Sequence, residues 1–123
     1  MRQLEINSRK YLLEYGQNAF CALEDQTGES IPEIMSALAK EPEKQLASFR
    51  FTRALLWAGL KSRRRNITLE EAGDILEQAG SEYMNVVSAA IEELTDSMVT
   101  IFPDIAKPED KKEETEKNVP ETA

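Results

Sequence analysis

Few residues of this chain have the types and spacing that chemistry at a protein site requires. The chain has no histidine, so Ser-His-Asp triads and histidine-based metal sites are excluded. Its single cysteine, Cys21, lies in the apolar segment AFCAL, where a free cysteine typically packs as a small core residue. A reactive thiol is the alternative. There is no CxxC, glycine-rich phosphate loop or HExxH motif. We therefore expect no enzymatic activity, no bound metal and no cofactor.

A cluster of cations is the one local anomaly in an acidic chain. The 123 residues carry a net charge of −8, yet six of the fifteen cations fall within sixteen positions. These six are Arg50, Arg53, Lys61, Arg63, Arg64 and Arg65. Three interpretations stay open: charges that suit a helix C-terminus and a solvated loop, a docking site for an acidic helix or another protein, and a nucleic-acid contact. The net negative charge of the chain opposes the third.

The first part of the cluster follows helical spacing around the only tryptophan. Arg50, Arg53, Trp57 and Lys61 recur at intervals that let one helix face present all four. Tryptophan and arginine are enriched at the energetic centres of protein interfaces. In the alternative interpretation, Trp57 is a core residue and the arginine stems lie beside it. The hypothetical partner-binding set comprises Arg50, Arg53, Trp57, Lys61, Arg63, Arg64 and Arg65.

The helix that would position these residues is the most apolar stretch of the chain. It runs from Leu46 to Leu60, LASFRFTRALLWAGL, with Pro42 as an early residue and Gly59 near its end. A helix that is apolar nearly all round is normally buried by neighbours on several sides. We therefore expect the other elements to pack around this helix.

The remaining elements are predicted from period-2 alternation, capping motifs and breakers. Alternation at residues 2–6 and 10–15, around Asn7-Ser8-Arg9-Lys10, predicts a β-hairpin. A short helix is expected from an Asn18 cap through Glu24, ending at Thr27-Gly28. Capping boxes at Ser30-Ile-Pro-Glu33 and Thr68-Leu-Glu-Glu71 predict two further helix starts. Ser81 is expected to cap a last helix that Pro103 stops. On that helix Glu92, Glu93 and Asp96 are expected to form a solvated face.

These elements predict a mainly α (α+β) fold, with a short N-terminal β-hairpin followed by a bundle of about five helices. Residues 1–103 would form this single domain, and residues 104–123 a disordered acidic tail or linker. No apolar run approaches the roughly 20 residues of a membrane helix, and the N-terminus lacks the apolar region of a secretory signal. We expect a cytoplasmic protein.

The order of these parts resembles the tail assembly chaperones of long-tailed bacteriophages and prophages. The resemblance is carried by LEINSRKYLLEYG, then FRFTRALLWAGL, then ITLEEAGDILEQAG, followed by a long amphipathic helix and a charged tail. It covers about residues 3 to 102 in pattern. Its most specific pieces are ALLWAGL and TLEEAGDIL with their spacing, and no single piece is diagnostic.

The resemblance implies a non-enzymatic role in the host cell cytoplasm. Such chaperones bind the tape-measure protein, keep it soluble, give way to tail-tube subunits and are absent from the mature virion. A frameshifted extension that recruits the tail-tube protein is common in the family, and a homo-oligomer is possible. Two alternatives stay open. One is a small cytoplasmic regulator that docks on nucleic acid through Lys61–Arg65; the other is a structural adaptor within the assembled tail.

Overall fold

The computed structural model describes residues 1–103, and the predicted tail of residues 104–123 lies outside the described residues. The described chain begins with two antiparallel strands, β1 (Arg2–Ile6) and β2 (Arg9–Leu13). Helices follow: α1 (Gln17–Thr27), α2 (Ile31–Lys40), α3 (Pro42–Leu46), α4 (Phe49–Leu60), α5 (Leu69–Ala79), the 3₁₀ turn η1 (Gly80–Glu82) and α6 (Tyr83–Ile101). The predicted fold class, a hairpin followed by a helical bundle, is confirmed.

A two-residue turn sets the register of the hairpin. Arg2 pairs with Leu13 and Ile6 with Arg9, so only Asn7 and Ser8 connect the strands. Both have positive φ, 55° and 71°, as the two central residues of a type I′ turn require. Alternate residues of the hairpin then face inward, and Ile6, Tyr11 and Leu13 are buried. The hairpin was predicted correctly, but β2 begins one residue earlier and ends two residues earlier than expected.

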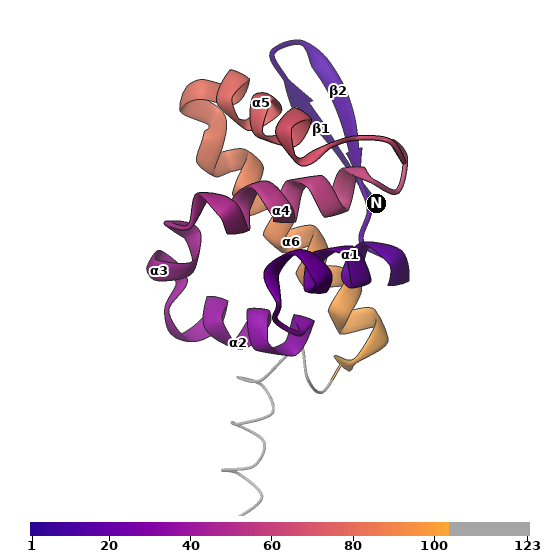
Figure 1. Cartoon of the computed structure of the whole chain (residues 1–123), viewed down its shortest axis with the longest axis vertical. Coiled ribbons are helices and arrows are strands. Elements are labelled where there is room, and N and C mark those ends of the chain that lie inside the picture. Colours follow the sequence, from indigo (N-terminus) through magenta and orange to yellow (C-terminus); the bar gives the residue numbers. More distant parts are fainter. Residues whose placement is uncertain (104–123) are drawn as a thin grey trace, which may run out of the picture.

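Helix α4 is the centre of the domain. It packs against β2 and against α1, α3, α5 and α6, and Figure 1 shows it in the middle of the bundle with α5 and the hairpin above it. Eight of its twelve residues are buried. The prediction of a helix covered on several sides is therefore confirmed, because no face of this segment is polar enough to remain in water.

The N-terminal boundary predicted for this helix was wrong. Pro42 and Leu46 belong to α3, a separate helix of five residues, and the chain leaves helical geometry before Phe49. The Ser48 side chain accepts a hydrogen bond from the Phe51 amide at 3.2 Å and caps α4. A serine at this position satisfies an amide that a continuous helix would pair with a backbone carbonyl. Phe49 consequently lies at the exposed start of α4 instead of on a buried face.

The caps of the other helices follow the sequence motifs only in part. Both capping boxes, Ser30 with Glu33 and Thr68 with Glu71, are present with reciprocal hydrogen bonds. Gly28 ends α1 in the left-handed region at φ 78°, as expected. The predicted Asn18 and Ser81 caps were wrong. Gly16 precedes α1 without a side-chain cap, and the residues around Ser81 form a 3₁₀ turn, so α6 begins at Tyr83.

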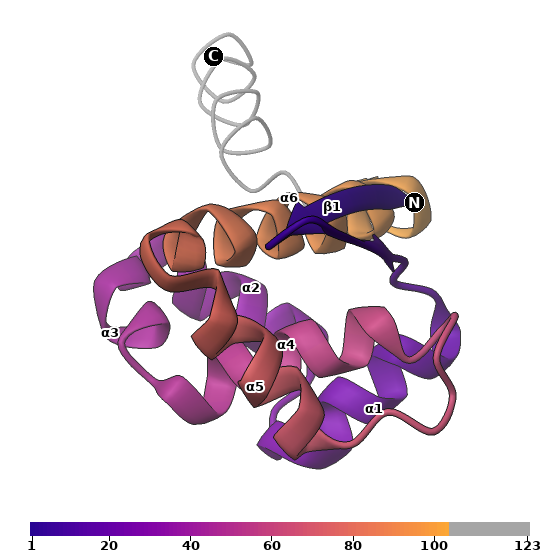
Figure 2. The same ribbon diagram turned by 90° about the horizontal axis from the view of Figure 1, so that it is seen from above.

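The start of the chain lies along α6, on the side seen from above in Figure 2. Glu93 is 6% exposed, so the prediction of a solvated face was wrong at this position. Its carboxylate accepts from the terminal amino group of Met1 at 2.6 Å and lies 3.5 Å from Arg2 Nε. Arg2 also reaches Glu92 and Asp96. A buried carboxylate is tolerated here because cations and hydrogen bonds compensate its charge.

The segment after the hairpin crosses α4 at its only glycine. The Glu14 amide donates to the Gly59 carbonyl at 3.0 Å. The buried Tyr15 side chain lies across the same point and donates from its hydroxyl to the Leu55 carbonyl at 2.6 Å. A Cβ atom on Gly59 would lie 2.6 Å from the Tyr15 ring and 2.8 Å from Leu13. The hairpin and the bundle can therefore approach this closely only because Gly59 has no side chain.

Candidate functional site

Of the four residues predicted as one helical strip, Arg50, Arg53 and Trp57 lie on α4 and Lys61 directly follows its last residue. They do not form one open surface. Arg50 is exposed, whereas Arg53, Trp57 and Lys61 are half-buried. The Arg53 stem passes over Gly73 of α5, where a Cβ atom would lie 3.2 Å from its Cδ. Helix α5 thus covers part of the strip, and the cationic groups of Arg50 and Arg53 gather near the start of α4.

Trp57 is held by the loop that follows α4. Its indole Nε1 donates to the Ile67 carbonyl at 3.0 Å, and the Lys61 ammonium lies 5.2 Å from the centre of the ring. The ring itself packs at the edge of the core. The indole donor is therefore already used within the domain. This position favours the core interpretation of Trp57, with Lys61 placed on its face as a cation–π partner.

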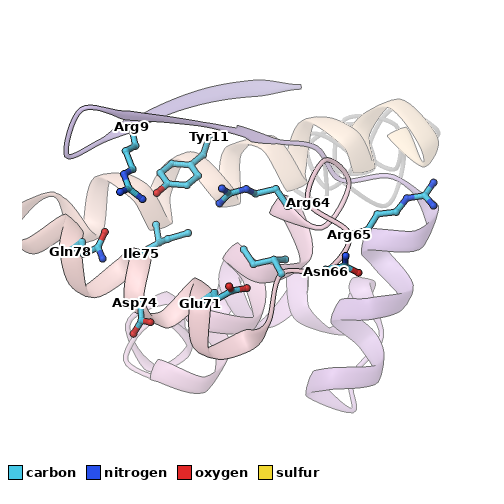
Figure 3. A pocket seen from close by; sticks show the side chains of 10 residues that line it. Arg9, Tyr11, Arg64, Arg65, Asn66, Glu71, Asp74, Ile75 and Gln78 are labelled. Atoms are coloured by element: carbon cyan, nitrogen blue, oxygen red, sulfur yellow. The ribbon is translucent and has the colours of Figure 1, made fainter.

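The three loop arginines separate onto different partners. Arg63 Nε forms an ion pair with Glu14 at 3.2 Å. Arg64 instead lies over Tyr11 of β2, with its guanidinium carbon 5.2 Å from the ring centre. Arg65 extends from the same loop in the direction away from Arg64 (Figure 3). Arg64 and Arg65 therefore have no acidic partner within the described residues.

Arg64 lines a groove between the hairpin and α5, which we call the Arg64 groove (Figure 3). Its cavity volume is about 560 Å³. One wall is cationic and aromatic, and α5 forms the other wall with the carboxylates of Glu71 and Asp74. The full lining is Arg9, Tyr11, Arg64, Arg65, Asn66, Ile67, Glu71, Asp74, Ile75 and Gln78. No sequence pattern predicted that Arg9 and Tyr11 would lie beside Arg64, because the two segments are more than fifty positions apart.

A second groove surrounds the exposed start of α4, and we call it the Phe49 groove. Phe49 is 76% exposed and meets Tyr83 edge to face, with ring centres 6.4 Å apart. The Tyr83 hydroxyl lies 2.6 Å from the Thr52 hydroxyl, which fixes the tyrosine side of the groove. The full lining is Phe49, Arg50, Thr52, Arg53, Gly73, Leu76, Glu77 and Tyr83.

The Phe49 groove combines apolar surface with two unpaired cations. Neither Arg50 nor Arg53 has an acidic partner within 4.0 Å in the described part of the chain. An exposed aromatic ring beside arginines has the composition of an interface centre. Sequence reasoning identified the two arginines but missed Phe49 and Tyr83. The signal that could have identified Phe49 was Ser48, because its preference for the N-cap position places Phe49 in the first turn of α4.

Cys21 and Tyr15 lie outside both grooves. Cys21 is exposed, so the expectation that it packs in the core was wrong. It lies on the outer face of α1, while Ala19, Phe20 and Leu23 point inward. Burial, with a smaller contribution from the charge of Glu93, raises the pKa of the Tyr15 hydroxyl well above its usual value. No group of three acidic or cysteine side chains within residues 1–103 could hold a metal ion.

No helix in the described part of the chain is both long and apolar enough to cross a membrane. Comparisons of the chain with protein-family models, with curated proteins and with solved structures find no match. The proposals below therefore depend on the geometry of the two grooves and on the order of the parts in the sequence.

Proposed function

We propose that this protein is a phage tail assembly chaperone that binds amphipathic segments of the tape-measure protein and keeps that protein soluble. The observation that carries the proposal is the Phe49 groove. Its exposed aromatic ring, apolar floor and two arginines suit the apolar face of a helix that also has acidic flanks. The resemblance in the order of the sequence segments points to the same class of protein.

The groove is already formed by rigid elements of the free protein. Phe49 and Arg53 project from α4, which is the most buried helix, and Tyr83 is tied to α4 through Thr52. A binding surface that needs little ordering loses less conformational entropy on binding. A small domain with such a surface can cover apolar parts of a long partner without any chemical step.

In this proposal the protein acts in the host cell cytoplasm and has no enzymatic role. It is displaced as tail-tube subunits assemble on the tape-measure protein, and it is absent from the mature virion. A longer frameshifted form would bring the tail-tube protein to the complex. Docking on nucleic acid receives less support, because Lys61, Arg63 and Arg64 all contact side chains of the domain itself.

The test is co-expression with a fragment of the tape-measure protein from the same phage, followed by size-exclusion chromatography with mass determination. We expect the fragment to be soluble only when the two proteins are expressed together, and to co-elute with this protein. Phe49→Ala should reduce recovery of the complex at least tenfold, since it removes a central aromatic contact. Leu12→Ala is the matched control, because Leu12 is also exposed but lies on the outer face of the hairpin.

Two results would overturn the proposal. The first is a cognate fragment that stays insoluble with and without the protein. The second is a complex that survives Phe49→Ala together with Arg50→Glu at the same yield as the Leu12→Ala control.

A further inference from the structure

The Arg64 groove has the features of a second binding site, built from segments that the Phe49 groove does not use. Its cationic wall consists of Arg9 at the start of β2, Tyr11 two residues later, and Arg64 from the loop after α4. Figure 3 shows Tyr11 between the two arginines, with all three side chains on the hairpin side of the hollow and Ile75 across from them.

One contact lies within this wall, because the Arg64 guanidinium carbon is 5.2 Å from the centre of the Tyr11 ring. Neither Arg9 nor Arg64 forms an ion pair within the described residues, although Arg63 beside it does. Although Tyr11 as a whole residue is 6% exposed, its hydroxyl oxygen remains accessible from the hollow that the residue lines. Two guanidinium groups and a phenol hydroxyl therefore line the same hollow.

The chemistry of this wall fits a carboxylate. Guanidinium groups donate two parallel hydrogen bonds to carboxylates, and the tyrosine hydroxyl supplies a further donor. A phosphate chain would be repelled by the opposite wall, because that wall carries the carboxylates of Glu71 and Asp74. The net charge of −8 adds to that repulsion.

The two walls together specify the occupant. A carboxylate row on one side of the ligand would meet Arg9 and Arg64, and a cationic row on its other side would meet Glu71 and Asp74. We propose that the Arg64 groove binds a protein segment with acidic side chains along one side and basic side chains along the other. This inference does not rest on the proposed function, because it concerns a different groove and a polar ligand.

The experiment is an NMR titration of the ¹⁵N-labelled full chain with a capped peptide of alternating glutamate and lysine. Such a peptide is neutral overall, so that the net charge of the protein neither attracts nor repels it. We expect shifts at the amides of Arg9, Tyr11 and Arg64–Ile67, with weaker binding at higher salt. A peptide with glutamine in place of each glutamate should cause no shifts there.

Arginine variants locate the contact. Arg9→Gln and Arg64→Gln should each weaken binding about tenfold, since a charge-assisted hydrogen bond is lost. Both side chains are exposed, so that the fold should persist. Arg63→Gln is the matched control: it is the adjacent residue, it removes the same charge, and its partner is Glu14. Tyr11→Phe should weaken binding about threefold, because it removes only the hydroxyl donor.

Three results would overturn the inference. One is equal loss of binding in Arg63→Gln and Arg64→Gln, which would indicate a general effect of charge. Another is a pattern of shifts confined to other surfaces. The third is stronger binding of oligothymidylate at the same amides, which would make the groove a phosphate site.

Discussion

The close crossing at Gly59 yields a sharp test of how the hairpin is joined to the bundle. In Gly59→Ala the new methyl group would meet the Tyr15 ring carbon and hydroxyl at 2.6 Å each and a Leu13 methyl at 2.8 Å. Neither side chain can move aside, because Leu13 is fully buried and the Tyr15 hydroxyl is bonded to the Leu55 carbonyl.

The magnitude follows from three terms. Overpacking of a core typically costs about 1–3 kcal/mol. Displacing the Tyr15 hydroxyl from the Leu55 carbonyl costs about 1 kcal/mol more. Replacing glycine by alanine within a helix stabilises the folded state by about 1 kcal/mol. We expect Gly59→Ala to lower the free energy of unfolding by about 1–3 kcal/mol, even though the substitution raises intrinsic helix propensity.

The matched control is Gly73→Ala, which makes the same chemical change in α5. There the new methyl group would lie 3.2 Å from Cδ of Arg53, a flexible stem that can shift. We expect its stability to stay within about 1 kcal/mol of the unmodified protein. Urea denaturation followed by far-ultraviolet circular dichroism measures both variants. Equal stability of the two variants would refute the reasoning, because the helix-propensity terms are the same and only the contacts differ.

Three further outcomes are expected. Ser8→Gly should raise the free energy of unfolding by about 0.5–1 kcal/mol in the same urea assay. The reason is that Asn-Gly suits a type I′ turn better than Asn-Ser. An unchanged free energy of unfolding would show that Ser8 is not strained in the turn. The raised pKa of Tyr15 means that its contribution to stability is fully present below pH ~10 and is lost at higher pH. Tyr15→Phe should therefore lower stability at neutral pH by about 1 kcal/mol, through loss of the bond to Leu55, and should make alkaline unfolding above pH ~10 less steep in circular dichroism. The Cys21 thiol should react with a maleimide in the native protein as fast as in urea, since it is exposed; protection in the native state would contradict its position on α1.

Features that depend on residues close together in the chain could be predicted from the amino-acid sequence. Both capping boxes formed where the motifs stood, because a serine or threonine and a glutamate three positions later satisfy two amides locally. The hairpin followed from alternation and its short turn, and α6 ended before Pro103. The central place of α4 also followed from its composition, since an element without a polar face must be enclosed.

Contacts between side chains that are far apart in the chain could not be predicted in this way. Phe49 and Cys21 both lie in apolar segments but are exposed, because the core covers only one face of α1 and the part of α4 from Phe51 onward. The Arg64 groove is lined by residues of the hairpin and of the loop after α4, which are far apart in the chain. The close crossing at Gly59 holds the hairpin against the bundle beside that loop. Such contacts depend on the angle and spacing at which elements pack, and local hydrogen-bonding rules and periodicity do not encode either quantity.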